Sequence, residues 1–128
     1  SLDATGRPQI SWLLREPETR QATGYIEVHD RGRVGLIAHL FVAPMYRHQG
    51  VAQALWRLAM AYIFQHCEHA MAACHVDNIA SRTLQIKNGF QSKGPVEGRP
   101  DLETLWLDKA SYQAAREREI AAMLANLC

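Results

Sequence analysis

Residues 42–52 read VAPMYRHQGVA and join an apolar run, Val34–Val42, to a helical pattern that begins near Gly50. The first N–H groups of a helix have no partner inside the helix, and the helix dipole adds partial positive charge there. A turn that directs several such groups at one point is therefore suited to bind phosphate. Gly50 lets the backbone approach an anion without a Cβ in the way, and Arg47 and His48 add charge or donors. The stretch predicts a phosphate-binding turn.

Two common phosphate-binding motifs do not occur in this sequence. A P-loop ends in Gly-Lys-Ser/Thr, and a dinucleotide-binding fold carries G-x-G-x-x-G. Neither pattern is found in the chain. The residues alone leave another interpretation open, in which Arg47–Gly50 is an ordinary polar turn between a strand and a helix.

Three extended segments precede this turn, at Gln9–Arg15, Gly24–Asp30 and Val34–Val42. The middle segment alternates, so that Tyr25, Glu27 and His29 face one way while Ile26 and Val28 face the other. Short breaks containing turn residues separate the segments. This spacing predicts three strands in an antiparallel meander.

A different period follows the turn. Apolar residues at helical spacing predict a helix over Gly50–His66, and the elements expected after it are a strand at Ala70–Val76, a helix at Ile79–Asn88, strands at Phe90–Lys93 and Glu103–Asp108 with Gly98–Pro100 as the turn between them, and a helix at Ser111–Leu127. We therefore predict a mixed α/β fold that forms one domain over residues 1–128.

The helix at Gly50–His66 is apolar on two sides. One side carries Val51, Leu55 and Ala59, and the other carries Trp56, Met60 and Phe64. A helix of this kind is either buried on both sides or covers a partner. Together with the C-terminal helix, this pattern predicts a homodimer.

Composition excludes several classes of protein. The apolar fraction of 48% and the charged fraction of 21% are typical of a globular domain. A net charge of +1 argues against a nucleic-acid partner, and no apolar stretch is long enough to cross a membrane. Cys67, Cys74 and Cys128 cannot all pair within one chain and show no metal-ligand spacing, so we expect free thiols, a cytoplasmic location and no metal site.

Two segments resemble the GNAT N-acetyltransferase superfamily. Residues 42–52 are similar to its acetyl-CoA motif, Q/R-x-x-G-x-G/A, and Asn78–Phe90, which reads NIASRTLQIKNGF, is similar to its N-x-x-A/S-x-x-L-Y-x-K-x-G-F helix. The two occur in the family's order, and the resemblance covers Ser11–Lys109. It implies a mainly antiparallel sheet in which the family's fourth and fifth strands, here Val34–Val42 and Ala70–Val76, run parallel and splay apart. Few residues precede the first strand, so we expect the family's N-terminal strand and helices to be missing or reduced.

The resemblance also implies a site for acetyl-CoA. Its pantetheine arm would lie between the splayed strands and its pyrophosphate would lie at the turn. The cofactor-binding residues implied in this way are Phe41, Val42, Arg47, His48, Gln49, Gly50, Val51, Ala52, Asn78, Ser81 and Leu84.

The resemblance further implies transfer of an acetyl group to a primary amine of a small molecule or peptide. Removal of the amine proton needs a base, for which His39 is the first candidate, Glu27 the second and His75 the third. His39 is alternatively a packing residue, and Glu27 a solvent-facing residue. Gln85 stands where many relatives have a tyrosine acid, and an amide cannot deliver a proton. Two other functions therefore stay open: a non-catalytic sensor of CoA or acetyl-CoA, and an interaction domain that has lost the cofactor.

Overall fold

The alternating segments at the start of the chain form the predicted meander. The computed structural model describes residues 1–127, and in it β1 (Gln9–Arg15) pairs antiparallel with β2 (Ala22–Asp30), which pairs antiparallel with β3 (Val34–Val42). Among these residues no helix precedes β1, and only a bridge between Leu2 and Pro8 lies upstream of it. The alternation of β2 is confirmed, because Ile26 and Val28 are fully buried in the core.

The second half of the chain completes a six-stranded sheet with the order β1-β2-β3-β4-β6-β5. β4 (His69–His75) runs parallel to β3, whereas β6 (Arg99–Asp108) runs antiparallel to β4 and pairs with the edge strand β5 (Gln91–Val96). Arg99 and Pro100 belong to β6 rather than to the predicted turn. A two-residue hairpin at Glu97–Gly98 suffices, since Gly98 adopts a φ of 77°.

The predicted splay occurs between β3 and β4. Their parallel pairing runs only from Val34↔His69 to Ile37↔Ala72, although both strands continue beyond it. Just past this point β3 carries a bulge, because Tyr25 faces Phe41 while Glu27 faces Ala38. The mixed α/β fold with one splayed parallel pair is thus confirmed.

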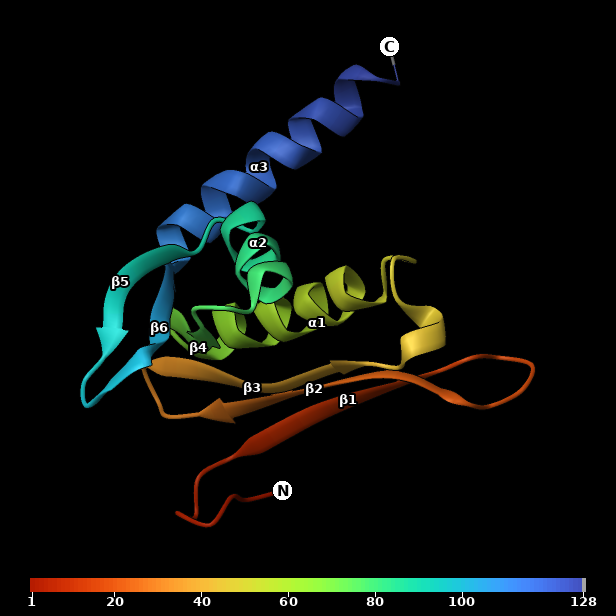
Figure 1. Ribbon diagram of the computed structural model, residues 1–128. Coiled ribbons are helices and arrows are strands. Elements are labelled where there is room, and N and C mark those ends of the chain that lie inside the picture. The colour runs from red at the N-terminus through yellow and green to blue at the C-terminus, as the bar shows by residue number, and fades with distance from the viewer. Residues whose placement is uncertain (128) are drawn as a thin grey trace.

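Helix α1 (Val51–His66) covers one face of the meander, after a short 3-10 turn η1 at Pro44–Tyr46 (Figure 1). The close approach of α1 to β3 explains Gly35. A Cβ there would lie 2.5 Å from Cγ1 of Ile63, so only glycine fits. Leu55 and Ile63, both fully buried, place the core between helix and sheet.

The second apolar side of α1 is covered within the same chain. Trp56 packs edge-on against Phe90, with ring centroids 5.2 Å apart. Phe64 stacks at 4.6 Å on Tyr112 of α3 (Lys109–Ala125), the C-terminal helix, which runs from β6 past α2 (Ile79–Lys87; Figure 1). The feature that predicted a homodimer therefore has an explanation in one chain.

Helix α2 (Ile79–Lys87) begins and ends as the sequence predicts, within one residue. The Asn78 side chain caps its first turn by accepting a hydrogen bond from the Ser81 N–H at 3.1 Å. At the other end Gly89 adopts a φ of 92°, which stops the helix.

The cysteines that the structure describes, Cys67 and Cys74, are free and buried, while Cys128 lies outside the described residues. Over residues 1–127, no helix combines the length and hydropathy that crossing a membrane requires.

Candidate functional site

A groove of about 600 Å³ lies where β3, the N-terminus of α1 and helix α2 meet. All of the predicted cofactor residues except Phe41 and Gln49 line it. The Phe41 side chain is exposed to solvent, and the Gln49 side chain donates to the Met45 carbonyl at 3.1 Å. The lining residues that sequence reasoning missed are Leu40, Tyr46, Gln53, Ala80 and Lys87. Of these, Gln53 directly follows the first quoted segment and Lys87 lies within the second, so helical spacing from the named residues would have found both.

The loop before α1 presents backbone N–H groups at one end of this groove. Both His48 and Gly50 have left-handed backbone, with φ of 63° and 82°. The first hydrogen bond of α1 runs from the Ala54 N–H to the Gly50 carbonyl at 3.0 Å, so the N–H groups of Val51 and Ala52 have no acceptor within the helix. A backbone in which positive and negative φ angles alternate directs successive N–H groups into a concave anion site, and the helix dipole adds partial positive charge there.

Gly50 itself faces open space. A Cβ at this position would meet no atom within 4 Å, so packing does not require glycine there. Its positive φ favours glycine, and a missing side chain leaves the helix end accessible to a ligand.

Arg47 is tied to the end of β3. Its Nε donates to the Val42 carbonyl at 3.2 Å. That carbonyl has a second lone pair, so it keeps the capacity to accept from a ligand in the groove. The guanidinium charge is thereby held beside the loop.

The opposite wall of the groove comes from α2, through Asn78, Ser81 and Leu84. Gln85, at the position of the family's tyrosine, is only 3% exposed and does not line the groove. Its Nε2 donates to the Ser81 hydroxyl at 3.0 Å, while its Oε1 is buried with no hydrogen-bond partner in residues 1–127. The position offers no group that can give up a proton to the groove.

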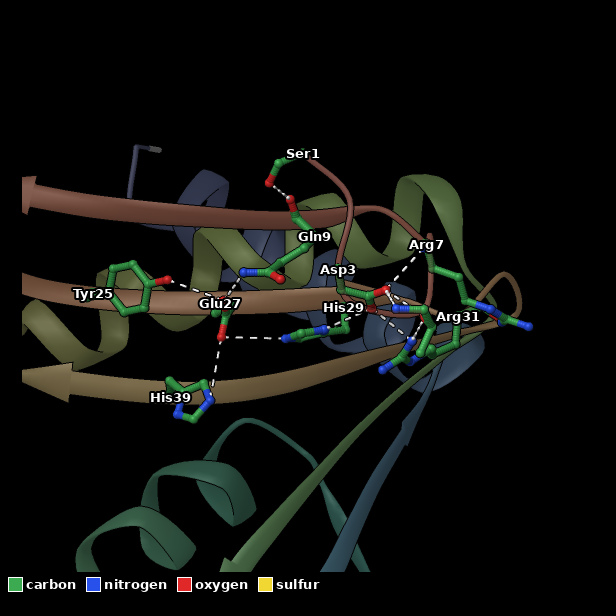
Figure 2. A network of polar contacts seen from close by, with 10 residues as sticks. Ser1, Asp3, Arg7, Gln9, Tyr25, Glu27, His29, Arg31 and His39 are labelled. Atoms are coloured by element: carbon green, nitrogen blue, oxygen red, sulfur yellow. Dashed lines mark hydrogen bonds and ion pairs between the residues drawn. The ribbon is translucent and has the colours of Figure 1, made fainter.

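A polar network lies beside the bulge of β3 (Figure 2). At its centre is Glu27, whose side chain is 9% exposed. Its Oε1 accepts from the Gln9 amide and, at 3.4 Å, from the Tyr25 hydroxyl. Its Oε2 lies 3.5 Å from Nε2 of His29 and 3.6 Å from Nε2 of His39. The structure thus brings the first two candidate bases together, and Glu27 is buried rather than solvent-facing.

The bulge is what directs His39 to Glu27. Strict alternation after Ile37, which is buried against α1, would turn His39 toward the helix. Instead His39 adopts a φ of 57°, its side chain is 76% exposed, and the next residue, Leu40, packs against the core. An exposed imidazole therefore sits next to a residue that lines the groove.

The network continues to the start of the chain through His29. Nδ1 of His29 lies 3.2 Å from Oδ2 of Asp3, which also accepts from Arg31 at 2.8 Å. Hydrogen bonds from the Thr5 hydroxyl, from the Arg7 N–H and from His29 hold the pKa of Asp3 well below its ordinary value. Ionisable groups thus follow one another from His39 through Glu27 and His29 to Asp3.

The third candidate base, His75, lies outside the network around Glu27. His75 ends β4, and its Nδ1 accepts from the Asp77 N–H at 3.2 Å. Its Nε2 is 3.7 Å from the Asp101 carboxylate. His75 is neither among the residues that line the groove nor among the contacts of Glu27.

Known proteins share this architecture. The chain resembles spermidine/spermine N-acetyltransferase SpeG of Vibrio cholerae with a TM-score of 0.71 and 19% identity, covering 84% of this chain and 69% of that one. It resembles the ribosomal-protein-S18-alanine N-acetyltransferase of Escherichia coli with a TM-score of 0.67 and 17% identity, covering 78% and 68%. It also resembles the PaiA N-acetyltransferase of Thermoplasma acidophilum, solved in complex with coenzyme A, with a TM-score of 0.66 and 16% identity, covering 77% of this chain and 60% of that one.

Identities this low establish the fold alone. No curated protein sequence matches the chain significantly. The model of the acetyltransferase (GNAT) family, however, matches residues 3–90, which is more than half of the chain and includes both the groove loop and the α2 motif. The chain therefore belongs to the acetyltransferase (GNAT) family.

Proposed function

We propose that this protein transfers the acetyl group of acetyl-CoA to a primary amine of a small molecule or peptide. One observation carries the proposal: a groove with an anion-binding end leads, at Leu40, to a histidine that contacts a buried carboxylate. The fold neighbours named above include N-acetyltransferases with amine acceptors as different as spermidine and a ribosomal protein, so the proposal stops at the amine class. Free buried thiols support a cytoplasmic location.

The residues present fit acetyl-CoA. The N–H groups of Val51 and Ala52 would hold the pyrophosphate at the N-terminus of α1. Backbone groups at Phe41 and Val42, where β3 has left β4, would bind the pantetheine amides as a neighbouring strand does. Leu84 supplies an apolar contact from the other wall. The cofactor, when bound, supplies an acetyl thioester.

The amine needs a base, because an ordinary alkyl amine is protonated at neutral pH and its lone pair must be free to attack. Nε2 of His39 faces the Glu27 carboxylate at 3.6 Å, so His39 accepts that proton at Nδ1, and the carboxylate stabilises the charged imidazole that results. Gln9 and Tyr25 fix Glu27 on its other oxygen, so the carboxylate keeps its position. Solvent then takes the proton from the exposed imidazole.

The leaving thiolate requires no dedicated acid in this scheme. Gln85 cannot donate a proton, and it is buried away from the groove. A thiol has a pKa of about 8.5, so its anion is a good leaving group and solvent can protonate it afterwards.

Gln85 also favours the second candidate function, a module that binds CoA or acetyl-CoA without catalysis. A regulatory domain needs the groove to bind the cofactor, but it needs no residue that acts as a general acid. The two functions share the cofactor and differ only in turnover, so a binding measurement comes first and a rate measurement separates them.

The test is calorimetric titration of acetyl-CoA and CoA into the wild type and Gly50→Glu. We expect a Kd in the micromolar range for the wild type and no detectable binding after a carboxylate enters the anion-binding loop. Gly32→Glu is the matched control, since Gly32 has a similar φ of 90° and equally open surroundings in the β2–β3 turn. Absence of binding to the wild type would contradict the proposal.

A thiol-release assay with a panel of amines then distinguishes enzyme from sensor. Release of CoA that depends on an added amine supports transfer. Tight binding without release by any amine of the panel favours the regulatory module.

A further inference from the structure

The network around Glu27 is a chain of side chains in which acids and bases alternate (Figure 2). Asp3 lies between Arg31, at 2.8 Å, and Nδ1 of His29, at 3.2 Å. Glu27 lies between two imidazoles, with its Oε2 3.5 Å from Nε2 of His29 and 3.6 Å from Nε2 of His39. Each carboxylate therefore has a base on either side of it.

Three members of this chain carry settled charges. Arg31 is protonated at any ordinary pH. Asp3 is ionised, because hydrogen bonds, chiefly from the Thr5 hydroxyl, hold its pKa well below its ordinary value. Glu27 accepts two hydrogen bonds at Oε1, which favour its ionised form. One positive and two negative charges leave one negative charge, which a single proton on an imidazole balances.

The two imidazoles compete for that proton on unequal terms. His29 faces a carboxylate with each ring nitrogen, and only the protonated ring carries an N–H on both. Burial by itself disfavours a charged ring, but at His29, whose side chain is 17% exposed, two carboxylates replace the water. His39 contacts one carboxylate in the part of the chain that the structure describes, and its side chain is 76% exposed. The geometry therefore favours the proton on His29.

The other elements packed around His29 bring no competing charge. Its neighbours across the sheet are Gln9 of β1 and Leu36 of β3, which are neutral. The exposed guanidinium of Arg7 donates to the Arg31 carbonyl at 3.0 Å, and over residues 1–127 it makes no ion pair with either carboxylate. The balance of charge at His29 thus rests on Asp3 and Glu27.

The place of this proton matters because a general base must be free of its own proton before it can act. Glu27 alone would attract a proton to His39, since a nearby opposite charge favours the charged ring. A proton on His29 offsets that attraction. The two Nε2 atoms contact the same oxygen and so lie at most about 7 Å apart, a distance at which like charges repel each other.

We propose that His29, held by Asp3, is a positioning residue for the transfer reaction: it keeps the proton of this chain on its own ring and leaves His39 free to accept one from the amine. The inference rests on the proposed function, because it takes His39 as the base. Once His39 has the amine proton, both rings are charged beside one carboxylate, and their repulsion favours release of that proton from His39 to solvent. His29 neither gains nor loses a proton in a turnover.

An NMR titration of the imidazole protons against pH tests the inference without cofactor or amine. The signals of each ring are identified by their absence from His29→Gln and His39→Asn. In the wild type, His29 should lose its proton at a higher pH than His39. In His29→Gln the midpoint for His39 should rise by about half a pH unit, which is the repulsion expected of unit charges about 7 Å apart in surroundings close to water.

Asp3→Asn is a second variant that leaves both rings in place. It removes one of the two carboxylates that His29 faces, so the midpoint for His29 should fall. His69→Gln is the matched control, because His69 pairs with Asp108 at 2.8 Å and contacts neither Glu27 nor the groove. It should leave the midpoints of both network rings unchanged.

The pH dependence of kcat/KM, measured with one amine, is the second readout. In His29→Gln the acidic limb should move up by the same amount as the midpoint for His39, because His39 then holds a proton to higher pH. The rate on the plateau above that limb and the Kd for acetyl-CoA should stay unchanged. A residue that only supported the fold would lower the rate at every pH instead.

Each other outcome has a separate meaning. A His29 that titrates below His39, or a midpoint for His39 that does not rise in His29→Gln, would overturn the inference and leave the proposed function standing. A rise in that midpoint without a move of the acidic limb would overturn it as well, because the proton on His39 would then not limit transfer. Absence of amine-dependent CoA release by the wild type would overturn the proposed function, and the role of His29 in transfer with it.

Discussion

The proposed anion-binding end of the groove and the network around Glu27 are built in opposite ways. The first is formed largely by backbone: the N–H groups of Val51 and Ala52, and left-handed positions at His48 and Gly50. It comes from one short segment of the chain. The second consists of side chains from the N-terminal segment and three strands, brought within contact distance by a bulge.

This difference predicts how each region responds to substitution. A backbone site tolerates most side-chain changes and fails when a side chain fills it or repels the anion, as at Gly50. A side-chain network loses function step by step, according to how directly each group meets the substrate. Variants of the network should therefore change the rate of transfer while leaving the binding of acetyl-CoA intact.

His39→Asn is the strongest test of that separation. Asparagine tolerates the left-handed backbone at this position but cannot accept the amine proton, so we expect kcat to fall about a hundredfold. The Kd for acetyl-CoA should stay unchanged. His75→Asn, the same change at the candidate that lies outside the network, should leave kcat within about twofold, as surface substitutions usually do. Equal losses in both variants would contradict the assignment of His39.

The sequence predicts the backbone site well because its signals are local. A strand, a turn with glycine and a helix occupy residues 34–66 without interruption, so period and turn residues suffice to locate the loop. The alternation of β2 likewise predicts which face Glu27 shares with Tyr25 and His29.

The network was predictable only in part, because its geometry depends on pairing between strands. No glycine marks the bulge at His39, and its positive φ follows from the way β3 leaves β4 while staying paired with β2. Asp3 gave no signal at all, since its contact with His29 joins residues 26 positions apart. The same holds for the fold. The hydrophobic pattern predicts the helices and strands, but it does not predict that Phe90 covers Trp56, because that contact joins residues far apart in the sequence.

Glu27→Gln should have an intermediate effect. The amide keeps the size of the side chain but removes the charge that stabilises protonated His39, so we expect kcat to fall about tenfold. The KM for acetyl-CoA should stay unchanged, because Glu27 does not line the groove. Glu18→Gln, an exposed carboxylate between β1 and β2, is the matched control. A change in KM alone would show that Glu27 acts through the fold rather than through His39.

The smallest expected effect is on the free energy of unfolding, and it concerns Cys67, a buried thiol close to a carboxylate of β2. Asp30 follows His29 in β2, and its Oδ1 lies 3.6 Å from the Cys67 sulfur. Burial, and secondly the charge of Asp30, raise the pKa of the Cys67 thiol to about 11. The unfolded chain loses this proton near its ordinary pKa of about 9, so ionisation of Cys67 favours unfolding as the pH rises from about 9 to 11.

Urea unfolding of the wild type and Cys67→Ala at pH 7 and pH 10.5 measures this contribution. At pH 7 the alanine variant should be less stable, by about 1 kcal/mol, because a buried sulfur is lost. At pH 10.5 the difference should shrink, since only the wild type loses stability through this thiol. The pKa of Tyr62 is raised by burial, by Asp30 and, least, by Cys67; the first two causes persist in both proteins, so most of the effect of Tyr62 on stability cancels in the comparison. A difference that stays constant with pH would mean that the thiol is no harder to ionise in the folded protein than in the unfolded chain.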